Sequence, residues 1–252
     1  MDLKDKVAIV TGASAGIGAA TVKALLKQGM KVVGFARRQE KIENLVDNHN
    51  GKLFARCVDL TKPQDIIDGF AWVTKNIGPV HILINNAGVS IASSVLTGEL
   101  EAWQQIMDTN LMSYAIASKE AVKIMKDNKM EGYIININSV VGYYDLFIPG
   151  NVMYRSSKLA LRAMTENIRV ELARMNSKIR ISSICPGLVK TEMMSVNYGE
   201  QASESFYSKY PHITSEDVAD TIVYVLSTPQ RVNISELIIR PTGEDVKQMA
   251  DI

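Results

Sequence analysis

Short apolar runs rich in β-branched residues recur along this 252-residue chain, and longer segments with helical periodicity separate them. The runs are apolar at nearly every position, which indicates strands covered on both faces. Strands that alternate with helices in this way form a parallel sheet with right-handed crossovers. We therefore expect a doubly wound α/β fold with a mostly parallel, seven-stranded sheet and helices on both faces. The expected strands lie at residues 7–10, 31–36, 53–58, 81–84, 133–137, 179–185 and 237–239. Helical patterns occupy residues 18–28, 62–76, 100–128 and 153–175.

The composition is that of an ordinary globular protein, with 46% hydrophobic and 22% charged residues. No linker or repeat divides the sequence, so we expect one domain over residues 1–252. The net charge of +1 gives no electrostatic reason to expect nucleic acid as a partner. The apolar run at 7–10 is too short for a signal peptide or a membrane span, and no long uncharged segment follows. We therefore expect a cytoplasmic protein.

The cysteines and histidines suggest no disulfide framework and no metal centre. Cys57 and Cys185 both lie in strand-like runs, which predicts two buried free thiols. His49, His81 and His212 are scattered singly along the chain, unlike the clustered ligands of a metal site.

A glycine-rich turn directly follows the first strand and opens the first helix. It runs from Thr11 to Gly18 and reads TGASAGIG. Glycines let the backbone approach a pyrophosphate, and the helix N-terminus offers free N–H groups with a favourable dipole. A glycine-rich turn without a ligand is the alternative, but the strand before it and the helix after it favour a dinucleotide site. The expected contacts in this turn are Gly12, Ser14, Gly16, Ile17 and Gly18.

The end of the second strand indicates which dinucleotide is preferred. A carboxylate there would accept hydrogen bonds from a free ribose 2′-hydroxyl, whereas arginine suits a 2′-phosphate. This strand ends in Arg37 and Arg38, with no carboxylate until Glu40. The pattern predicts NADP(H), with NAD(H) still possible. Two solvated arginines that open the next helix are the alternative interpretation.

A tyrosine and a lysine four positions apart form the first candidate for acid/base chemistry. Tyr154 and Lys158 are neighbours on one face of the helix expected at 153–175. A phenol titrates near a pKa of about 10, and a nearby cation favours the phenolate and lowers that value. Ser139, just past the fifth strand, carries a hydroxyl able to polarise a substrate oxygen. Without the other residues of the motif, the better interpretation of Ser139 would be a serine that caps the end of a strand.

Taken together, these motifs resemble the short-chain dehydrogenase/reductase family from residue 5 to about residue 241. The glycine turn matches the family pattern, and Asn110, Ser139, Tyr154 and Lys158 match its catalytic tetrad in order. The resemblance implies a Rossmann fold and direct hydride transfer to or from a nicotinamide ring, with Tyr154 as the acid/base and no metal. Lys158 would also bind the nicotinamide ribose. Asn110 would position a water that links Lys158 to solvent, unless it merely faces solvent.

The resemblance also implies cofactor contacts beyond the glycine turn. Asp59 would accept from the adenine amino group, although it could equally cap the helix that begins near residue 62. The Asn-Asn-Ala-Gly element at residues 85–88, which ends the fourth strand, would line the adenosine side, although such residues also suit an ordinary turn. Thr191 would contact the nicotinamide carboxamide. The contacts implied in this way are Asp59, Leu60, Asn86, Ala87, Gly88, Pro186, Gly187, Val189 and Thr191.

Two variable segments are expected to wall the substrate pocket. One is residues 141–148, and the other is a long stretch at about 190–214 that we interpret as a lid loop. The lid is rich in Met and aromatic residues and has no arginine cluster, which favours an apolar alcohol or carbonyl substrate. Packing of these residues onto the body of the protein is the alternative. They are Met193, Met194, Tyr198, Phe206, Tyr207 and Tyr210.

The ends of the second and last strands resemble an animal subgroup of farnesol dehydrogenase-like and dehydrogenase/reductase member-eleven-like enzymes. The matching segments are residues 34–38 and 238–242. The resemblance implies a terpenoid alcohol substrate such as farnesol or geraniol. Reduction of keto-steroids or general carbonyls, a 3-oxoacyl reductase and a catalytically silent dinucleotide-binding module remain alternatives. The helices at 100–128 and 153–175 build subunit interfaces in the family, which implies a homodimer or homotetramer.

Overall fold

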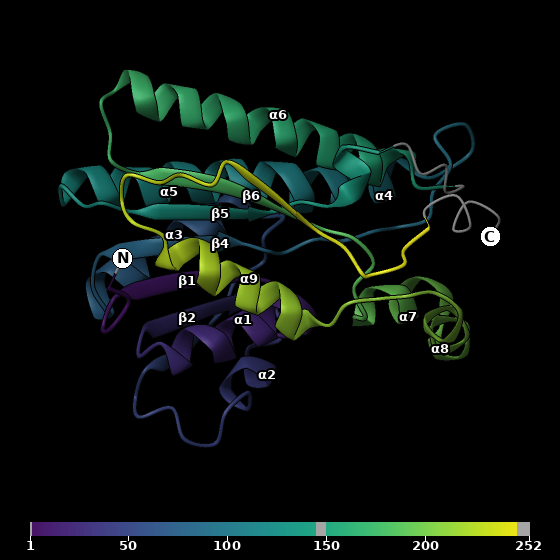
Figure 1. Ribbon diagram of the computed structural model, residues 1–252, viewed down its shortest axis with the longest axis horizontal. Helices are drawn as coiled ribbons and strands as arrows, with labels where there is room; N and C mark the ends of the chain where they lie inside the picture. Colours follow the sequence, from purple (N-terminus) through teal and green to yellow (C-terminus); the bar gives the residue numbers. More distant parts are fainter. Residues whose placement is uncertain (1, 145–149, 246–252) are drawn as a thin grey trace.

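The computed structural model describes residues 2–144 and 150–245, which form one parallel sheet flanked by helices (Figure 1). The sheet has seven strands in the order β3-β2-β1-β4-β5-β6-β7. The predicted doubly wound Rossmann-type α/β fold is confirmed. The strands are β1 (Val7–Thr11), β2 (Lys31–Ala36), β3 (Leu53–Cys57), β4 (Val80–Asn85), β5 (Tyr133–Ile137), β6 (Arg180–Pro186) and β7 (Glu236–Ile239). The helices are α1 (Gly16–Lys27), α2 (Gln39–Glu43), α3 (Pro63–Asn76), α4 (Leu100–Met107), α5 (Ser113–Asp127), α6 (Val152–Arg174), α7 (Glu192–Tyr198), α8 (Glu200–Lys209) and α9 (Ser215–Ser227).

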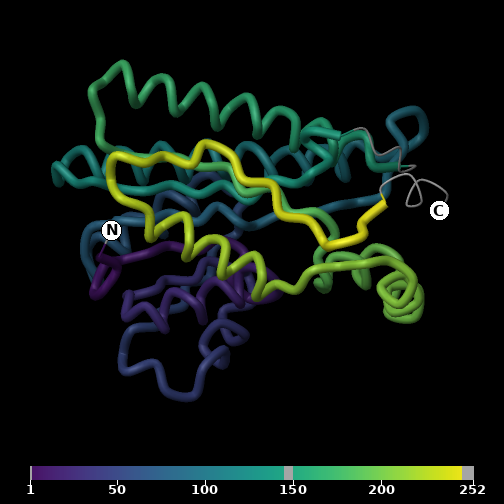
Figure 2. The backbone as a smooth tube through the Cα atoms, viewed as in Figure 1, coloured from purple at the N-terminus to yellow at the C-terminus, as the bar shows by residue number. Residues whose placement is uncertain are grey.

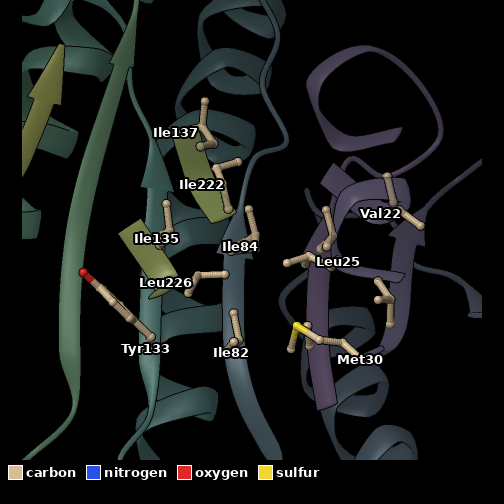
Figure 3. Close-up of a cluster of buried hydrophobic side chains, with 14 of the residues drawn as sticks. Val22, Leu25, Met30, Ile82, Ile84, Tyr133, Ile135, Ile137, Ile222 and Leu226 are labelled. Carbon is tan, nitrogen blue, oxygen red and sulfur yellow. The ribbon is translucent and has the colours of Figure 1, made fainter. Parts of the chain in front are cut away.

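Apolar residues on both faces of the central strands divide the core into two layers. Along β1, Ala8 and Val10 join the cluster under α1, α2 and α9, whereas Val7 and Ile9 join the cluster under α3, α5 and α6. Figure 3 shows the first layer, with Ile84 of β4 beside Ile222 and Leu226 of α9. Side chains alternate between the faces of a strand, so a strand buried on both sides is apolar at most of its positions.

The order of the strands determines where a ligand can bind. β1 pairs with β2 on one side and with β4 on the other, so the sheet extends in opposite directions from this point. In open α/β sheets, ligands bind at the carboxyl ends of the strands beside such a reversal. The turn after β1, with its glycines, lies there.

The segment predicted as a lid loop is partly helical, so that prediction is corrected. Helices α7 and α8 fill most of residues 190–214, and a parallel bridge between Val189 and Ile213 joins the two ends of the excursion. The Lys190 N–H donates to the Ile213 carbonyl at 2.9 Å. Figure 2 follows the chain out from β6 through α7 and α8 and back into α9. Both helices are short and bury few side chains, which is why their periodicity was weak in the sequence.

The two cysteines have different environments, which corrects a second expectation. Cys185 is buried in β6, as predicted, but Cys57 is exposed. Cys57 ends β3, and β3 is an edge strand that pairs only with β2. A strand at the edge of a sheet is less covered than a central strand. The sequence of the strand alone does not show which of the two positions it occupies.

Within residues 2–144 and 150–245, no three His, Cys, Asp or Glu side chains gather as metal ligands do. His81 accepts a hydrogen bond from the Val7 N–H, and His49 accepts one from the Leu53 N–H. In the same described ranges, no helix has both the length and the apolar character needed to cross a membrane.

Candidate active site

The turn between β1 and α1 exposes a helix N-terminus without a side-chain cap. Ala15 is the N-cap residue and makes no side-chain hydrogen bond, and no acidic residue occupies the first turn of α1. Gly12 and Gly16 adopt positive φ angles of 64° and 53°, which glycine accommodates without strain. Ile17 packs against the core below the turn. The first N–H groups of α1 therefore remain available to an anion.

Asn86 fixes the glycine turn to the end of β4. Its side-chain amide donates to the carbonyl oxygens of Thr11 at 2.9 Å and Gly12 at 3.3 Å. In return, the Thr11 hydroxyl accepts from the N–H groups of Asn86 and Ala87 at 2.9 and 3.1 Å. Thr11 was not among the predicted site residues. The Asn-Asn-Ala-Gly element thus joins the ends of β1 and β4 by hydrogen bonds. An ordinary turn would only reverse the direction of the chain.

Gly18 lies where the backbone of the turn crosses α1. A β-carbon at this position would overlap the Gly12 carbonyl oxygen and would lie 2.6 Å from the Asn86 amide nitrogen. We expect Gly18→Ala to lower the free energy of unfolding by about 2 kcal/mol, because backbone cannot move away as a flexible side chain can. Dinucleotide affinity should fall about tenfold, which corresponds to about 1.4 kcal/mol. Urea unfolding and fluorescence titration with NADPH measure the two effects.

Gly51→Ala is the control for Gly18→Ala. A β-carbon at Gly51 meets no atom within 4 Å, although its φ of 68° is strained for alanine. Gly51→Ala should lower the free energy of unfolding by about 1 kcal/mol and leave dinucleotide binding unchanged. Equal effects of the two substitutions on binding would contradict the close approach at Gly18.

The two arginines after β2 point to different neighbours. The Arg38 guanidinium donates to the Ser14 hydroxyl of the glycine turn at 3.4 Å, and it also pairs with Glu192 of α7 at 3.3 Å. The charge of Arg37 acts on Asp59 at the end of β3 instead. Of the two predicted phosphate contacts, Arg38 lies at the glycine turn, and the contact of Arg37 stays a prediction.

Asp59 forms a turn of its own and does not cap α3. Its Oδ1 accepts from the Thr61 N–H at 3.1 Å and from the Thr61 hydroxyl at 2.8 Å, whereas Lys62 occupies the N-cap position. Burial alone would raise the pKa of Asp59, but the hydrogen bonds from Thr61 and the charge of Lys62 lower it below its ordinary value. Asp59 is therefore a charged acceptor at the end of β3. Leu60 beside it packs against the second core layer.

Lys158 is a buried cation in the first turns of α6. Its ammonium group donates to the Ile137 carbonyl at the end of β5 at 2.9 Å and lies 5.8 Å from the centre of the Tyr114 ring. It also lies 5.7 Å from the centre of the Tyr154 ring. Burial lowers the pKa of Lys158 to about 8. A β-carbon at Gly88 would come within 4.0 Å of this ammonium, so the end of β4 reaches the same place.

The Tyr154 phenol lies between Ser139 and Lys158. Part of the residue still reaches solvent, but burial raises the pKa of the phenol, and a hydrogen bond with Ser139 offsets this only in part. The sequence predicted the opposite direction, from the nearness of the lysine. The direction differs because burial of the phenol raises its pKa by more than the hydrogen bond with Ser139 lowers it, and the Lys158 ammonium group donates to the Ile137 carbonyl instead. Ser139 also accepts from the Val141 N–H, so it caps a short 3-10 turn as well as facing the tyrosine.

Asn110 is fully buried, so it does not face solvent. It lies in a π-helical turn, Asp108–Met112, that interrupts the helix predicted at 100–128, and such turns are frequent at functional sites. Its amide accepts from the Val89 N–H at 2.8 Å and donates to the Ser157 hydroxyl at 3.2 Å. Ser157 in turn donates to the Tyr154 carbonyl at 2.6 Å. The sequence did not single out Ser157, which connects Asn110 to the helix that carries Tyr154.

The turn after β6 closes the other side of the site. The Gly187 N–H donates to the Ile239 carbonyl at 2.7 Å, and the Leu188 N–H donates to the buried carboxylate of Glu244 at 3.1 Å. Pro186 ends β6 within the sheet, and Val189 packs against the first core layer. The Thr191 side chain caps α7, and its methyl would lie 3.3 Å from a β-carbon at Gly16. The Gly187–Thr191 turn and the glycine turn therefore face each other. Glu244 was missed because a buried acid near a chain end has no sequence signature.

Three aromatic residues of the segment at 190–214 pack together, and the Tyr207 hydroxyl donates to the Val189 carbonyl in the turn after β6. Tyr207 is buried, and Phe206 lies 5.9 Å from it and 4.8 Å from Tyr210, measured between ring centres. These three residues therefore fit the alternative interpretation, in which the aromatic side chains pack the segment onto the body of the protein. Met193 and Met194 of α7 remain half-buried, and Tyr198 is exposed. Of the other predicted wall, residues 145–148 lie outside the described residues.

Comparisons with known proteins agree with this geometry. Residues 6–201 match the family model for short chain dehydrogenases. The farnesol dehydrogenase of Aedes aegypti is 41% identical over 244 residues, which cover 95% of this chain and 97% of that protein. Human dehydrogenase/reductase SDR family member 11 is 36% identical over 249 residues, which cover 96% of each chain.

A solved structure, the closed form of serine dehydrogenase complexed with NADP⁺, has a TM-score of 0.87 at 29% identity. The alignment covers 95% of this chain and 96% of that one. The family match and the two relatives show that this chain belongs to the short-chain dehydrogenase/reductase family of oxidoreductases, in the subgroup of the farnesol dehydrogenase and the member 11 enzymes.

Proposed function

We propose that this enzyme uses NADP(H) to interconvert an apolar alcohol, a terpenoid alcohol such as farnesol or geraniol, with its aldehyde or ketone. The observation that carries the proposal is the meeting of Tyr154, Ser139 and Lys158 at the carboxyl ends of β4 and β5. The Aedes aegypti relative, a farnesol dehydrogenase, supports the substrate class. The half-buried Met193 and Met194 of the lid offer apolar contacts to such a substrate.

The residues at the carboxyl ends of the central strands fit a nicotinamide dinucleotide. The uncapped N-terminus of α1 would hold the pyrophosphate with Gly12, Ser14, Gly16, Ile17 and Gly18. Arg38 would bind the 2′-phosphate beside Ser14, and the charged Asp59 carboxylate would accept from the adenine amino group. The NADP⁺ in the neighbouring serine dehydrogenase structure supports the choice of cofactor. The remaining contacts would come from Arg37, Leu60, Asn86, Ala87, Gly88, Tyr154, Lys158, Pro186, Gly187, Val189 and Thr191.

In the proposed mechanism, Tyr154 moves the proton and Ser139 orients the substrate oxygen. When bound, NADP(H) supplies the hydride acceptor for oxidation or the hydride donor for reduction. The Tyr154 phenolate takes the hydroxyl proton of the alcohol in oxidation, and the phenol returns a proton to the carbonyl oxygen in reduction. Ser139 donates a hydrogen bond to the same substrate oxygen.

Lys158 and Asn110 would support this proton transfer. A protonated Lys158 that turns from the Ile137 carbonyl towards the ribose would bring its charge near the phenol and favour the phenolate. Asn110 would position a water between Lys158 and solvent. The hydrogen bonds of Asn110 to Val89 and Ser157 hold it rigidly for this role.

Initial rates test the proposal. Farnesol, geraniol, keto-steroids, a 3-oxoacyl thioester and simple carbonyls would be assayed with NADP(H) and with NAD(H). We expect the largest kcat/KM for the terpenoid alcohols with NADP⁺, because an apolar pocket gains most from a long apolar chain. No turnover of any terpenoid alcohol with either cofactor would contradict the substrate class. A preference for NAD⁺ would contradict the cofactor assignment alone.

A further inference from the structure

Glu192, the first residue of α7, contacts the basic group expected to bind the 2′-phosphate. Its Oε2 lies 3.3 Å from Nη2 of Arg38, and its Oε1 lies 3.8 Å from the ammonium group of Lys41 in α2. The same Arg38 nitrogen lies 3.4 Å from the Ser14 hydroxyl. The Glu192 carboxylate therefore contacts the Arg38 guanidinium on the side where an anionic ligand at the glycine turn would bind.

This carboxylate comes from a different part of the molecule than the basic residues do. Arg38 and Lys41 follow β2, whereas Glu192 follows β6 and begins the lid. The next residue back, Thr191, packs against the glycine turn at Gly16. The start of α7 thus contacts the residues that follow β2, and its carboxylate supplies the acidic group that the end of β2 lacks.

We propose that Glu192 sets the selectivity between NADP(H) and NAD(H), by competing with the 2′-phosphate for Arg38 and Lys41. This inference rests on the proposed function, which assigns the 2′-phosphate to Arg38. A bound 2′-phosphate would replace Glu192 as the partner of Arg38 and Lys41. The phosphate and the Glu192 carboxylate would then lie side by side, and their repulsion opposes binding of the phosphate. A 2′-hydroxyl carries no charge, and the Glu192 carboxylate is an acceptor for it.

The solvent exposure of the pair determines how strong the competition is. The Arg38 and Glu192 side chains keep 47% and 51% of their exposure, and Lys41 keeps 46%. Exposed ion pairs contribute little free energy of stabilisation. A phosphate, which has more charge and three acceptor oxygens, can therefore displace the Glu192 carboxylate from Arg38. Displacement would also free the first turn of α7 from α2, so that phosphate binding and the position of the lid are linked.

Glu192→Gln tests the proposal by direct binding. Titration calorimetry would measure NADPH, NADH and 2′,5′-ADP, which carries the 2′-phosphate without the nicotinamide. We expect NADPH and 2′,5′-ADP to bind about fivefold more tightly to Glu192→Gln, as the loss of one exposed like charge predicts. NADH should bind equally well or more weakly. The gain should shrink at high ionic strength, because salt screens exposed charges.

Glu200→Gln is the matched control, because it removes the same charge from an exposed position at the start of α8. Its NADPH and NADH affinities should equal those of the wild type. Lys41→Gln should weaken NADPH and 2′,5′-ADP while leaving NADH unchanged. Thermal unfolding of each variant verifies that the fold is intact.

The outcomes separate this inference from the proposed function. If the wild type binds NADPH and Glu192→Gln binds it no better than Glu200→Gln does, the inference is wrong and the cofactor assignment stands. A loss of NADPH affinity in Glu192→Gln would also overturn it, because Glu192 would then hold Arg38 in place for the phosphate. If the wild type binds NADH but neither NADPH nor 2′,5′-ADP, both the cofactor assignment and the inference are wrong.

Discussion

Replacing Tyr154 with phenylalanine is expected to lower kcat about 10³-fold, in the range by which a positioned acid/base accelerates a reaction. The substitution removes the phenol oxygen that would carry the proton and keeps the ring that packs at the start of α6. Ser139 would still bind the substrate oxygen, but a serine hydroxyl is a far weaker acid than the phenol. NADPH affinity should stay within about twofold of the wild type, because the proposed cofactor contacts other than Tyr154 remain.

Steady-state rates and a fluorescence titration with NADPH measure these two quantities. Tyr224→Phe is the control, because it removes the same hydroxyl from an exposed position on α9. Its kcat should be that of the wild type. If Tyr154→Phe retained more than about a tenth of the wild-type kcat, Tyr154 would not be the acid/base.

The second large effect is expected for Lys158→Met, which should inactivate the enzyme and stabilise the fold. Methionine has a similar length but no charge, so it removes both the proposed ribose contact and the cation beside the phenol. The folded protein, however, holds the pKa of Lys158 at about 8, against an ordinary value of 10.5. That difference corresponds to about 3 kcal/mol of cost for burying the charge at neutral pH. The Ile137 carbonyl keeps a partner, because the Tyr114 hydroxyl also donates to it at 3.2 Å.

The pH dependence of this stabilisation has a definite sign. Below pH 8, Lys158 is protonated in both states, and the folded state alone bears the cost of burial. Between pH 8 and 10.5 the folded protein has lost the proton and the unfolded chain still holds it, so the stability of the wild type rises with pH. The advantage of Lys158→Met is therefore largest at pH 7 and disappears near pH 10.5.

Urea unfolding at pH 7 and pH 10 compares Lys158→Met with the wild type. Lys123→Met, on the exposed face of α5, is the control and should change the free energy of unfolding by no more than about 0.5 kcal/mol. A Lys158→Met variant less stable than the wild type at pH 7 would mean that the lysine is a net stabilising residue. Its charge would then not be costly in the folded state.

The amino-acid sequence by itself determined the sheet and the glycine turn. Strands buried on both faces are apolar at nearly every position, so the runs at 7–10 and 133–137 could be assigned without knowing their neighbours. The turn at Thr11 to Gly18 could be recognised because its function depends on backbone geometry, and only glycine permits that geometry. The π-helical turn at Asn110 was not predicted, because a single wider turn inside a helix leaves the segments on either side of it helical.

Only the tertiary structure decided which charges meet and what environment each one has. Arg38 and Glu192 are 154 positions apart, and no local pattern joins them. The pairing depends on the parallel bridge between Val189 and Ile213, which holds the two ends of the segment that carries α7. The burial of Lys158 likewise depends on β6, α4 and the π-helical turn at Asp108–Met112, which pack against α6. A pKa is set by desolvation and by nearby charges in space, so the chemistry of these residues could be named from the sequence but their protonation could not.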